Sequence, residues 1–306
     1  MGLLGKGGDT PLQLTMHGRT DAGQVRDHNE DTFWYNEELG AAIVADGIGG
    51  HAAGEVASKL TVQAFERTVL KKLSRARELD HIRAMLGESI VVANRRVLST
   101  IERDPARNGM GSTAVCACLW REVFVIAHIG DSRAYLVRDG AITQLTKDHS
   151  FVQSLVDQGV IQPEEAAVHP RRNIITRCVG DPAEAEADLC ALEAEPGDML
   201  LLCSDGLTEV LGDDEILAVC QQYRSVRRIC NVLVQRTLEG GAPDNVTVLT
   251  MSLGGGRAWS TACAIFCRRT SCRAWSPNWA LCRRCPTGGR LLTPFLLRIS
   301  FPHDTI

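Results

Sequence analysis

The alternation of apolar and polar positions divides the chain into short strand-like runs and longer helix-like runs. Apolar runs of strand length, bounded by glycine, asparagine or aspartate, predict strands at 40–45, 112–120, 122–130, 133–140, 141–146, 197–206 and 245–253. Apolar residues at helical spacing predict helices at 55–79, 89–103, 149–159, 213–222 and 226–238. The opening segment 12–36 is polar and rich in turn residues around "DAGQVRDHNEDTFW".

The order of these elements excludes a simple parallel sheet. Asp139-Gly140 separates two strand-like runs and is a strong signal for a two-residue hairpin turn. The helices are grouped outside the runs of strands instead of alternating with them, and no solenoid-type repeat is present. The pattern therefore favours antiparallel sheets with helices packed outside them.

Composition indicates an ordinary globular protein. Of 306 residues, 44% are hydrophobic and 23% are charged, and no apolar run reaches the length of a membrane helix. The opening "MGLLGKGGDT" lacks the apolar core of a secretory signal and the Ser or Thr at position 6 of a myristoylation motif. We therefore expect a cytoplasmic protein without a membrane partner.

Charge is distributed unevenly. Eight arginines and one acid follow residue 256, which gives these residues +7 and leaves −11 for residues 1–256, against a total of −4. An acidic body argues against a nucleic-acid groove, because phosphate binding needs clustered cations. Excess acid is usually a solvated surface, and metal binding is the alternative that needs positional evidence.

Seven cysteines precede residue 257 and lie mostly among apolar residues. Without an export signal, they are better interpreted as reduced core residues than as a disulfide framework. Cys203, next to an Asp-Gly pair, is the one that could be a nucleophile. Its strand is apolar and no C-x5-R phosphate loop follows, so we expect a core residue.

Four aspartates stand beside strand-like runs, in "ADG" (45–47), "GDS" (130–132), "SDG" (204–206) and "PDN" (243–245). One Asp-Gly would be only a turn, and "DGIGGH" is a weak match to a phosphate loop because no Walker lysine follows. Carboxylates that converge at one sheet edge repel one another unless cations lie between them. Hard divalent ions prefer such oxygen ligands, and glycine after the acid lets the backbone approach closely.

At this point the sequence resembles the type-2C, metal-dependent protein phosphatase (PPM) family of the compact bacterial kind. The matching motifs occur in family order: "VRDHNED" (25–31), "VADGIGGHAAGEVAS" (44–58), "GMGSTAV" (109–115), "HIGDSRAYLVRDG" (128–140), "LTKDHS" (145–150), "HPRRNIITRCVG" (169–180), "LLLCSDGLTEVL" (200–211) and "GAPDNVTVL" (241–249). The resemblance implies an α+β fold, a four-layer α-β-β-α sandwich in which helices flank two packed antiparallel sheets. It covers a phosphatase domain at 12–253, with a flap at about 150–181, after an N-terminal extension at 1–11.

The resemblance also implies a metal centre with two divalent cations, Mn²⁺ or Mg²⁺. Asp46 would bridge them, Asp205 and Asp244 would complete the ligands of the first, and the Gly47 carbonyl would bind the second. Glu30 and Asp31 would hold metal-bound waters. Asp131 would belong to a third, weaker metal site.

Three of these positions keep a simpler alternative. Asp131 could be only a turn acid. Arg26, whose guanidinium matches the geometry of a phosphate group, could be only a surface arginine. His51, a candidate general acid near the leaving oxygen, could be only a loop histidine.

The implied reaction is hydrolysis of phosphoserine or phosphothreonine in proteins by in-line attack of a water between the cations. The implied partners are phosphoprotein substrates and a Ser/Thr protein kinase as functional counterpart, and we expect a monomer. Two other functions are a non-catalytic module that binds phosphoproteins and a hydrolase of small phosphoesters. The presence of Asp46, Asp205 and Asp244 favours an active enzyme over the first.

Residues 254–306 match nothing in the family. From Arg257 onwards they contain five cysteines, three of the five tryptophans and no lysine. A zinc-binding or nucleic-acid-binding appendage built on Cys282-x-x-Cys285, an interaction tail and a non-native reading frame are the competing interpretations. We expect this segment to be disordered.

Overall fold

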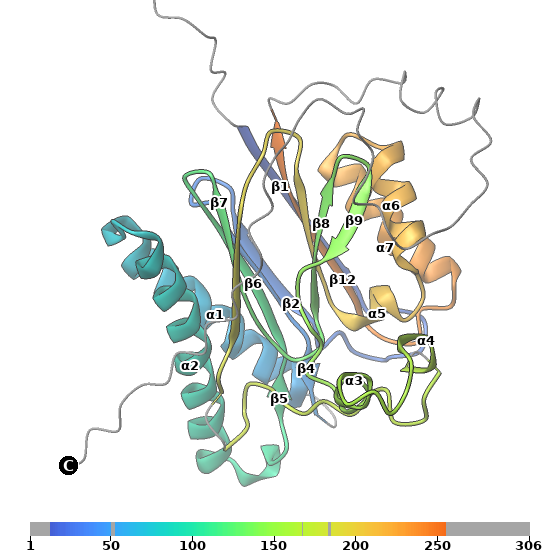
Figure 1. The fold of residues 1–306 in the computed structure, drawn as a ribbon. Helices are drawn as coiled ribbons and strands as arrows, with labels where there is room; N and C mark the ends of the chain where they lie inside the picture. The colour runs from blue at the N-terminus through green and yellow to red at the C-terminus, as the bar shows by residue number, and fades with distance from the viewer. Residues whose placement is uncertain (1–12, 50–52, 167, 183–184, 255–306) are drawn as a thin grey trace, which may run out of the picture. The chain divides into compact units, whose positions relative to one another are not determined.

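The computed structural model describes residues 13–49, 53–166, 168–182 and 185–254. Two five-stranded antiparallel sheets form its centre (Figure 1). The first sheet has the order β1 (Gln13–Asp21), β12 (Val246–Gly254), β11 (Met199–Cys203), β8 (Arg133–Arg138) and β9 (Ala141–Gln144). The second has the order β10 (Asp188–Glu193), β7 (Val123–Ile129), β6 (Ala114–Trp120), β3 (Ala41–Ala45) and β2 (Thr32–Asn36).

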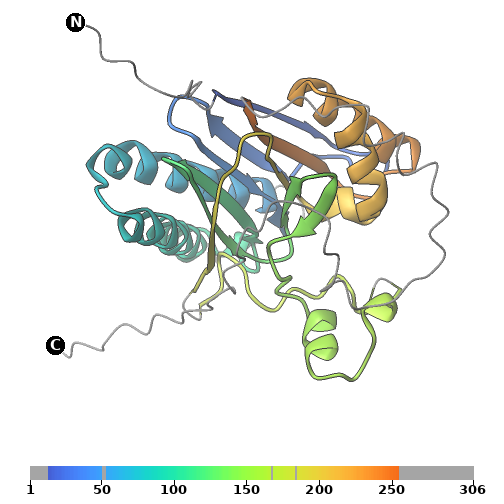
Figure 2. The same cartoon turned by 45° about the horizontal axis from the view of Figure 1, so that its top comes forward.

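Helices cover the outer face of each sheet (Figure 2). The hairpin of α1 (Ala53–Lys72) and α2 (Leu79–Arg103) packs on the second sheet, and α6 (Asp213–Gln222) and α7 (Val226–Glu239) pack on the first. The smaller elements are β4 (Gly47–Ile48), β5 (Gly111–Ser112), α3 (Phe151–Asp157), α4 (Pro163–Ala166), α5 (Asp205–Thr208) and the 3₁₀ turns η1 (Leu73–Arg75) and η2 (Pro105–Arg107). The expected four-layer sandwich is confirmed.

Each layer boundary is an apolar core. Val44, Ile126, Leu202 and Leu249 are among the buried residues that fill the space between the two sheets. Since alternate side chains of a strand point to opposite faces, the neighbouring residues of the same strands contact the helices on the outside. Strands β3, β6, β7 and β11 are therefore apolar on both faces, which explains why their sequence signal is continuous.

The expected hairpin between β8 and β9 is present. Arg138 pairs with Ala141 across a two-residue loop, and Asp139 and Gly140 have φ of +50° and +80°. Positive φ at both loop positions matches the right-handed twist of the strands, and Asp-Gly tolerates it. The helices predicted at 213–222 and 226–238 also form, the second ending one residue later.

The opening segment, expected only to be polar and turn-rich, contains β1 and β2. No local pattern predicted β10 either. All three are edge strands in which Met16 of β1 is the only buried side chain. Pairing with β12, β3 and β7 holds them in place, so their apolar pattern is weak.

The boundary between the first two helices was also misplaced. Helix α1 ends at Lys72, seven residues before the predicted end, and α2 begins at Leu79, ten residues before the predicted start. Ile82, Met85 and Leu86 are buried and continue the apolar stripe of α2 towards its N-terminus. A turn with exposed charged side chains separates the helices.

Three expectations concern residues outside the described ones. These are the extension at 1–11, the tail from residue 255 onwards and His51. No helix among the described residues is long and apolar enough to cross a membrane. The seven cysteines of the described chain are free, and five of them are buried, as expected for core residues.

Candidate functional site

Carboxyl groups gather at one edge of the sandwich, where strands of both sheets end or begin. Asp46 directly follows β3 and Asp31 precedes β2 in the second sheet. Asp205 lies two residues after β11, Asp244 two residues before β12, and Asp131 in the turn from β7 to β8. Antiparallel pairing places these strand ends together, because Thr32 pairs with Ala45 and Cys203 pairs with Val248.

The carboxyl groups are close enough to control one another's protonation. Burial, followed by the charges of Asp31, Asp205 and Asp131, raises the pKa of Asp46 well above its ordinary value. Burial, followed by the charges of Asp131, Glu209, Asp244 and Asp31, does the same for the pKa of Asp205. The structure thus brings Asp31, Asp46, Asp131, Asp205 and Asp244 close to one another.

Asp31 is the most firmly held of these acids. Its Oδ2 accepts hydrogen bonds from the hydroxyls of Ser204 (2.7 Å) and Thr247 (2.6 Å), both from the other sheet. Burial raises the pKa of Asp31 to about 6, although these two bonds lower it. Ser204 and Thr247 were not predicted as site residues, because an isolated hydroxyl in or next to a strand carries no sequence signal.

Three buried carboxylate oxygens have no hydrogen-bond partner among the residues that the structure describes: Oδ1 of Asp31, Asp131 and Asp205. A buried polar oxygen without a partner loses the solvation it had in water, which costs about 1–3 kcal/mol or more for a charged group. Oxygen atoms of this kind, converging from several elements, are the ligands that Mg²⁺ and Mn²⁺ prefer. The residues present therefore fit divalent cations.

We call the five aspartates Asp31, Asp46, Asp131, Asp205 and Asp244 the acid ring. Their carboxyl groups are spread more widely than the ligands of a single ion. Within the described chain, the one group of three metal-ligating side chains whose donor atoms lie within 4.8 Å of one another is His128, His149 and Asp188. Two cations about 3.5–4 Å apart need ligands on both sides of the pair, and so a wider ring. In the histidine group, Arg177 Nη1 donates to Asp188 Oδ1 at 2.9 Å, so a guanidinium already supplies the positive charge.

Glycines allow the backbone to pack tightly behind the acids. A Cβ on Gly47 would collide with the carbonyl oxygen of Gly54, and one on Gly206 would collide with that of Asn245. These positions need glycine for close approach and not for a positive φ. Asp46 is fixed at its backbone, where its N–H donates to Thr113 Oγ1 (3.0 Å) and its carbonyl accepts from the Thr113 N–H (2.8 Å).

Asn245 holds the loop that carries Glu30 and Arg26. Its Nδ2 donates to the carbonyls of Ala22 and His28 at 2.9 Å each, and its Oδ1 accepts from the N–H of Glu30 at 2.7 Å. Burial is also the main cause that raises the pKa of Glu30. Asn245 stood in the "PDN" motif but was not predicted as a site residue.

Arg26 reaches the acid cluster from the solvent side. Its Nη2 donates to Asp244 Oδ2 at 2.7 Å, and just over half of its side chain (54%) is exposed. This hydrogen bond raises the pKa of Arg26. An exposed guanidinium beside the acids is placed to meet an anion that approaches from solvent.

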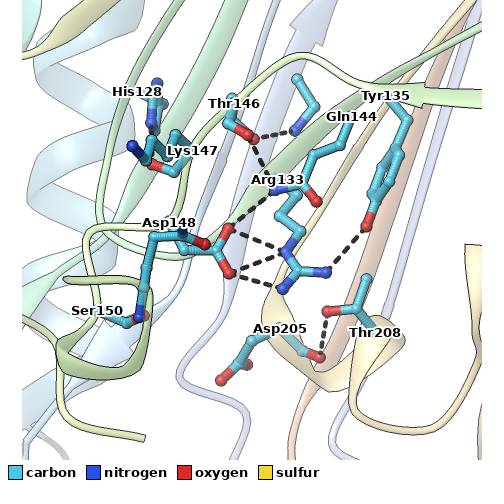
Figure 3. Close-up of polar contacts among 12 residues, drawn as sticks. His128, Arg133, Tyr135, Gln144, Thr146, Lys147, Asp148, Ser150, Asp205 and Thr208 are labelled. Carbon is cyan, nitrogen blue, oxygen red and sulfur yellow. Dashed lines mark hydrogen bonds and ion pairs between the residues drawn. The ribbon is translucent and has the colours of Figure 1, made fainter. Parts of the chain in front are cut away.

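A partly buried ion pair lies beside the acids. Arg133 Nε and Nη2 donate to Asp148 Oδ1 (3.0 Å) and Oδ2 (2.6 Å), and Arg133 Nη1 donates to the hydroxyl of Tyr135 (3.1 Å), as Figure 3 shows together with Asp205. Burial, followed by the charge of Asp148, raises the pKa of Asp131 to about 6, while Arg133 lowers it. The pair thus fixes the start of β8 beside Asp131.

The predicted flap is anchored at both ends. Ser150 pairs with Ile175 and Ser112 pairs with Val179 in isolated bridges. Helices α3 and α4 lie between these anchors, and Arg172 Nη2 lies 3.8 Å from Glu209 Oε1, next to α5. Cys203 is buried, and burial raises the pKa of its thiol to about 12, so it is a core residue as expected and not a nucleophile.

Comparison with known proteins relates this architecture to phosphatases. The family model for protein phosphatase 2C matches residues 20–240. A serine/threonine protein phosphatase PstP of Mycobacterium tuberculosis is 42% identical over 238 residues, and a serine/threonine phosphatase stp of Listeria welshimeri is 37% identical over 234 residues. These matches cover 78% and 76% of this chain, and 45% and 92% of the relatives. The chain thus matches less than half the length of the mycobacterial relative.

A solved structure shares the fold over the same region. The crystal structure of the catalytic domain of a PstP phosphatase in complex with two manganese ions superposes with a TM-score of 0.72 at 38% identity. The match covers 80% of this chain and all of that domain.

Proposed function

Because the chain belongs to the protein phosphatase 2C family, we propose that it hydrolyses phosphoserine and phosphothreonine esters in proteins with the help of two divalent cations, Mn²⁺ or Mg²⁺. The observation that carries the proposal is the ring of carboxyl groups from both sheets, with three buried oxygens that lack a partner. A non-catalytic module would not need to keep these destabilising groups.

Each acid has a proposed role. Asp46 would be a ligand shared by the two cations, and the Gly47 carbonyl would be a further ligand of one of them. Asp205 and Asp244 would complete the ligands of the other. Glu30 and Asp31 would hold waters at the cations, and Asp131 would belong to a third, weaker site. The mutual electrostatic coupling of the aspartates supports this assignment.

When bound, the cations supply charge stabilisation and activate a water molecule for attack on phosphorus. The chain's own contribution is to orient the substrate. Arg26 stands at the solvent side of the ring, where its donors match the oxygens of a phosphate monoester. Its hydrogen bond to Asp244 fixes the direction of the guanidinium before the substrate arrives. His51 stays a candidate for protonating the leaving oxygen.

The test is hydrolysis of an aryl phosphate and of a phosphoserine peptide, with and without Mn²⁺. Asp205→Asn and Asp244→Asn keep the side-chain volume and remove a charged ligand, so we expect both to lower the Mn²⁺-dependent rate by at least about a hundredfold. Asp214→Asn, an exposed acid on α6, is the matched control and should retain the wild-type rate. Full activity in either ligand variant would refute the two-cation assignment. A rate on sugar phosphates above that on phosphopeptides would refute the protein substrate.

Three wider expectations belong to the same proposal. A Ser/Thr protein kinase is the functional counterpart, the chain acts as a monomer, and it acts in the cytoplasm. Phosphoproteomics with and without the gene tests the first, because sites that gain phosphate on deletion should be kinase products. Light scattering of the purified chain and fractionation of cells test the other two.

A further inference from the structure

A groove between α1 and α2 is lined by arginines that have no partner. Its volume is about 440 Å³, and four of its nine lining residues are Arg67, Arg95, Arg96 and Arg103. No acidic side chain lines it. Among the residues that the structure describes, none of these four guanidinium groups forms an ion pair or a side-chain hydrogen bond.

This concentration of charge is unusual for the molecule. Residues 1–256 carry a net charge of −11. Three other basic side chains of the two helices are paired: Lys59 contacts Glu55, Lys72 contacts Glu88 and Arg83 contacts Asp80. Four like charges around one groove repel one another. An anionic ligand in the groove would remove that repulsion, which is the first argument for a binding surface.

The shape of the groove limits what the ligand can be. Arg96 and Arg103 lie seven residues apart on one face of α2, and the lining extends from Val92 to Arg103, a rise of about 16 Å. A single phosphate or sulfate is too small to contact arginines along that length. Leu60 of α1 and Val92 of α2, both partly exposed, add apolar surface between the charges.

These features favour a protein segment over a nucleic acid. None of the described residues that line the groove is aromatic, so they offer bases no surface on which to stack. A long polyanion would also extend beyond the groove over a body of net charge −11, which repels it. A short acidic segment with apolar residues among its carboxylates satisfies both the arginines and the apolar surface.

We propose that the α1–α2 groove docks an acidic, partly apolar segment of a partner protein. The groove is separate from the acid ring in its residues and chemistry, so the proposal goes beyond the phosphatase activity and does not depend on it. Carboxylates of the segment pair with the guanidinium groups, and its apolar side chains cover Leu60 and Val92.

The test is fluorescence anisotropy of a labelled peptide made of glutamate and leucine, titrated with the full chain. We expect Arg96→Glu combined with Arg103→Glu to weaken binding at least about tenfold, since two attractive contacts become repulsive. The matched control combines Arg224→Glu with Arg227→Glu, which changes the net charge equally on exposed arginines of the other helix layer. The control should bind within about twofold of the wild type.

Control measurements and two other ligands test the proposal further. Circular dichroism and aryl phosphate hydrolysis check that each variant is folded. If the double glutamate variant does not fold, the double variant Arg96→Gln with Arg103→Gln takes its place. Equal weakening in the groove variant and its control would overturn the proposal. So would equal binding of a peptide with glutamine in place of glutamate. Tighter, Arg96-dependent binding of single-stranded DNA would overturn the assignment to a protein partner.

Discussion

The ion pair of Arg133 and Asp148 offers the sharpest test of how the site is supported. The side chains are 28% and 12% exposed, and they share three hydrogen bonds of 2.6–3.1 Å. Removing one partner leaves the other as a buried, uncompensated charge, which costs about 3–5 kcal/mol. In Arg133→Met the charge left behind is Asp148, which is 12% exposed and still accepts a hydrogen bond from Gln144, so we expect a loss at the lower end, about 3 kcal/mol.

The assay is a double-mutant cycle measured by urea unfolding, with Tm measured by thermal unfolding of the same variants. For a domain of this size, the single variant Arg133→Met should lower Tm by roughly 6–12 °C. The double variant with Asp148→Leu should recover part of that loss, because no charge is left unpaired, although Gln144 and Tyr135 lose their partners. We therefore expect a coupling energy of about 2 kcal/mol.

An exposed pair in the same chain is the control. Arg83 Nη1 and Asp80 Oδ1 are 3.0 Å apart, with side chains 41% and 80% exposed, and solvent screens them. Their coupling energy should stay below about 0.5 kcal/mol. Additive losses at Arg133 and Asp148, with coupling no larger than in the control, would refute the view that this pair is a structural support.

Three further predictions address the phosphate-binding residue, the packing behind the acids and the pH dependence of stability. Arg26→Ala should lower kcat/KM for an aryl phosphate about ten- to hundredfold while Tm stays within about 2 °C, since Arg26 is exposed; an unchanged kcat/KM would remove it from the site. Gly206→Ala should cost at least about 2 kcal/mol in urea unfolding because its Cβ would collide with the Asn245 carbonyl, and wild-type stability would contradict that geometry. Burial lowers the pKa of His128, so the unfolded state takes up its proton first as pH falls below about 6.5, and the contribution of His128 to stability should drop there by at most about 1.4 kcal/mol per pH unit; stability of His128→Gln should therefore fall less, or rise more, than that of the wild type over this range, and equal slopes would count against it.

The sequence predicted the interior of the fold better than its edges. Buried strands such as β3 and β11 are apolar on both faces, so their signal survives without knowledge of their neighbours. The edge strands β1, β2 and β10 are held by pairing with partners distant in the chain, as Met16 with Met251 illustrates, and local pattern does not contain that information.

The same distinction applies to the site. The acids were predictable because each stands beside an apolar run and a glycine, and because the order of the motifs resembles a known family. The hydroxyls of Ser204 and Thr247 were not, since they act on Asp31 only after two sheets have packed together. Asn245 could have been predicted as a site residue, because it adjoins Asp244 in the "PDN" motif. The structure shows that it fixes the loop of Glu30 by three hydrogen bonds.

The acid ring draws on both sheets, and this has a consequence for how the protein tolerates change. Asp31 and Asp46 move with the second sheet, whereas Asp205 and Asp244 move with the first. Any sliding of one layer over the other alters the spacing of the ring. Substitutions in the core between the two sheets, at Val44 or Leu202 for example, would therefore change the distances between the acids and with them the catalytic rate, although neither side chain belongs to the acid ring. The apolar core between the two sheets thus sets the spacing of the acid ring.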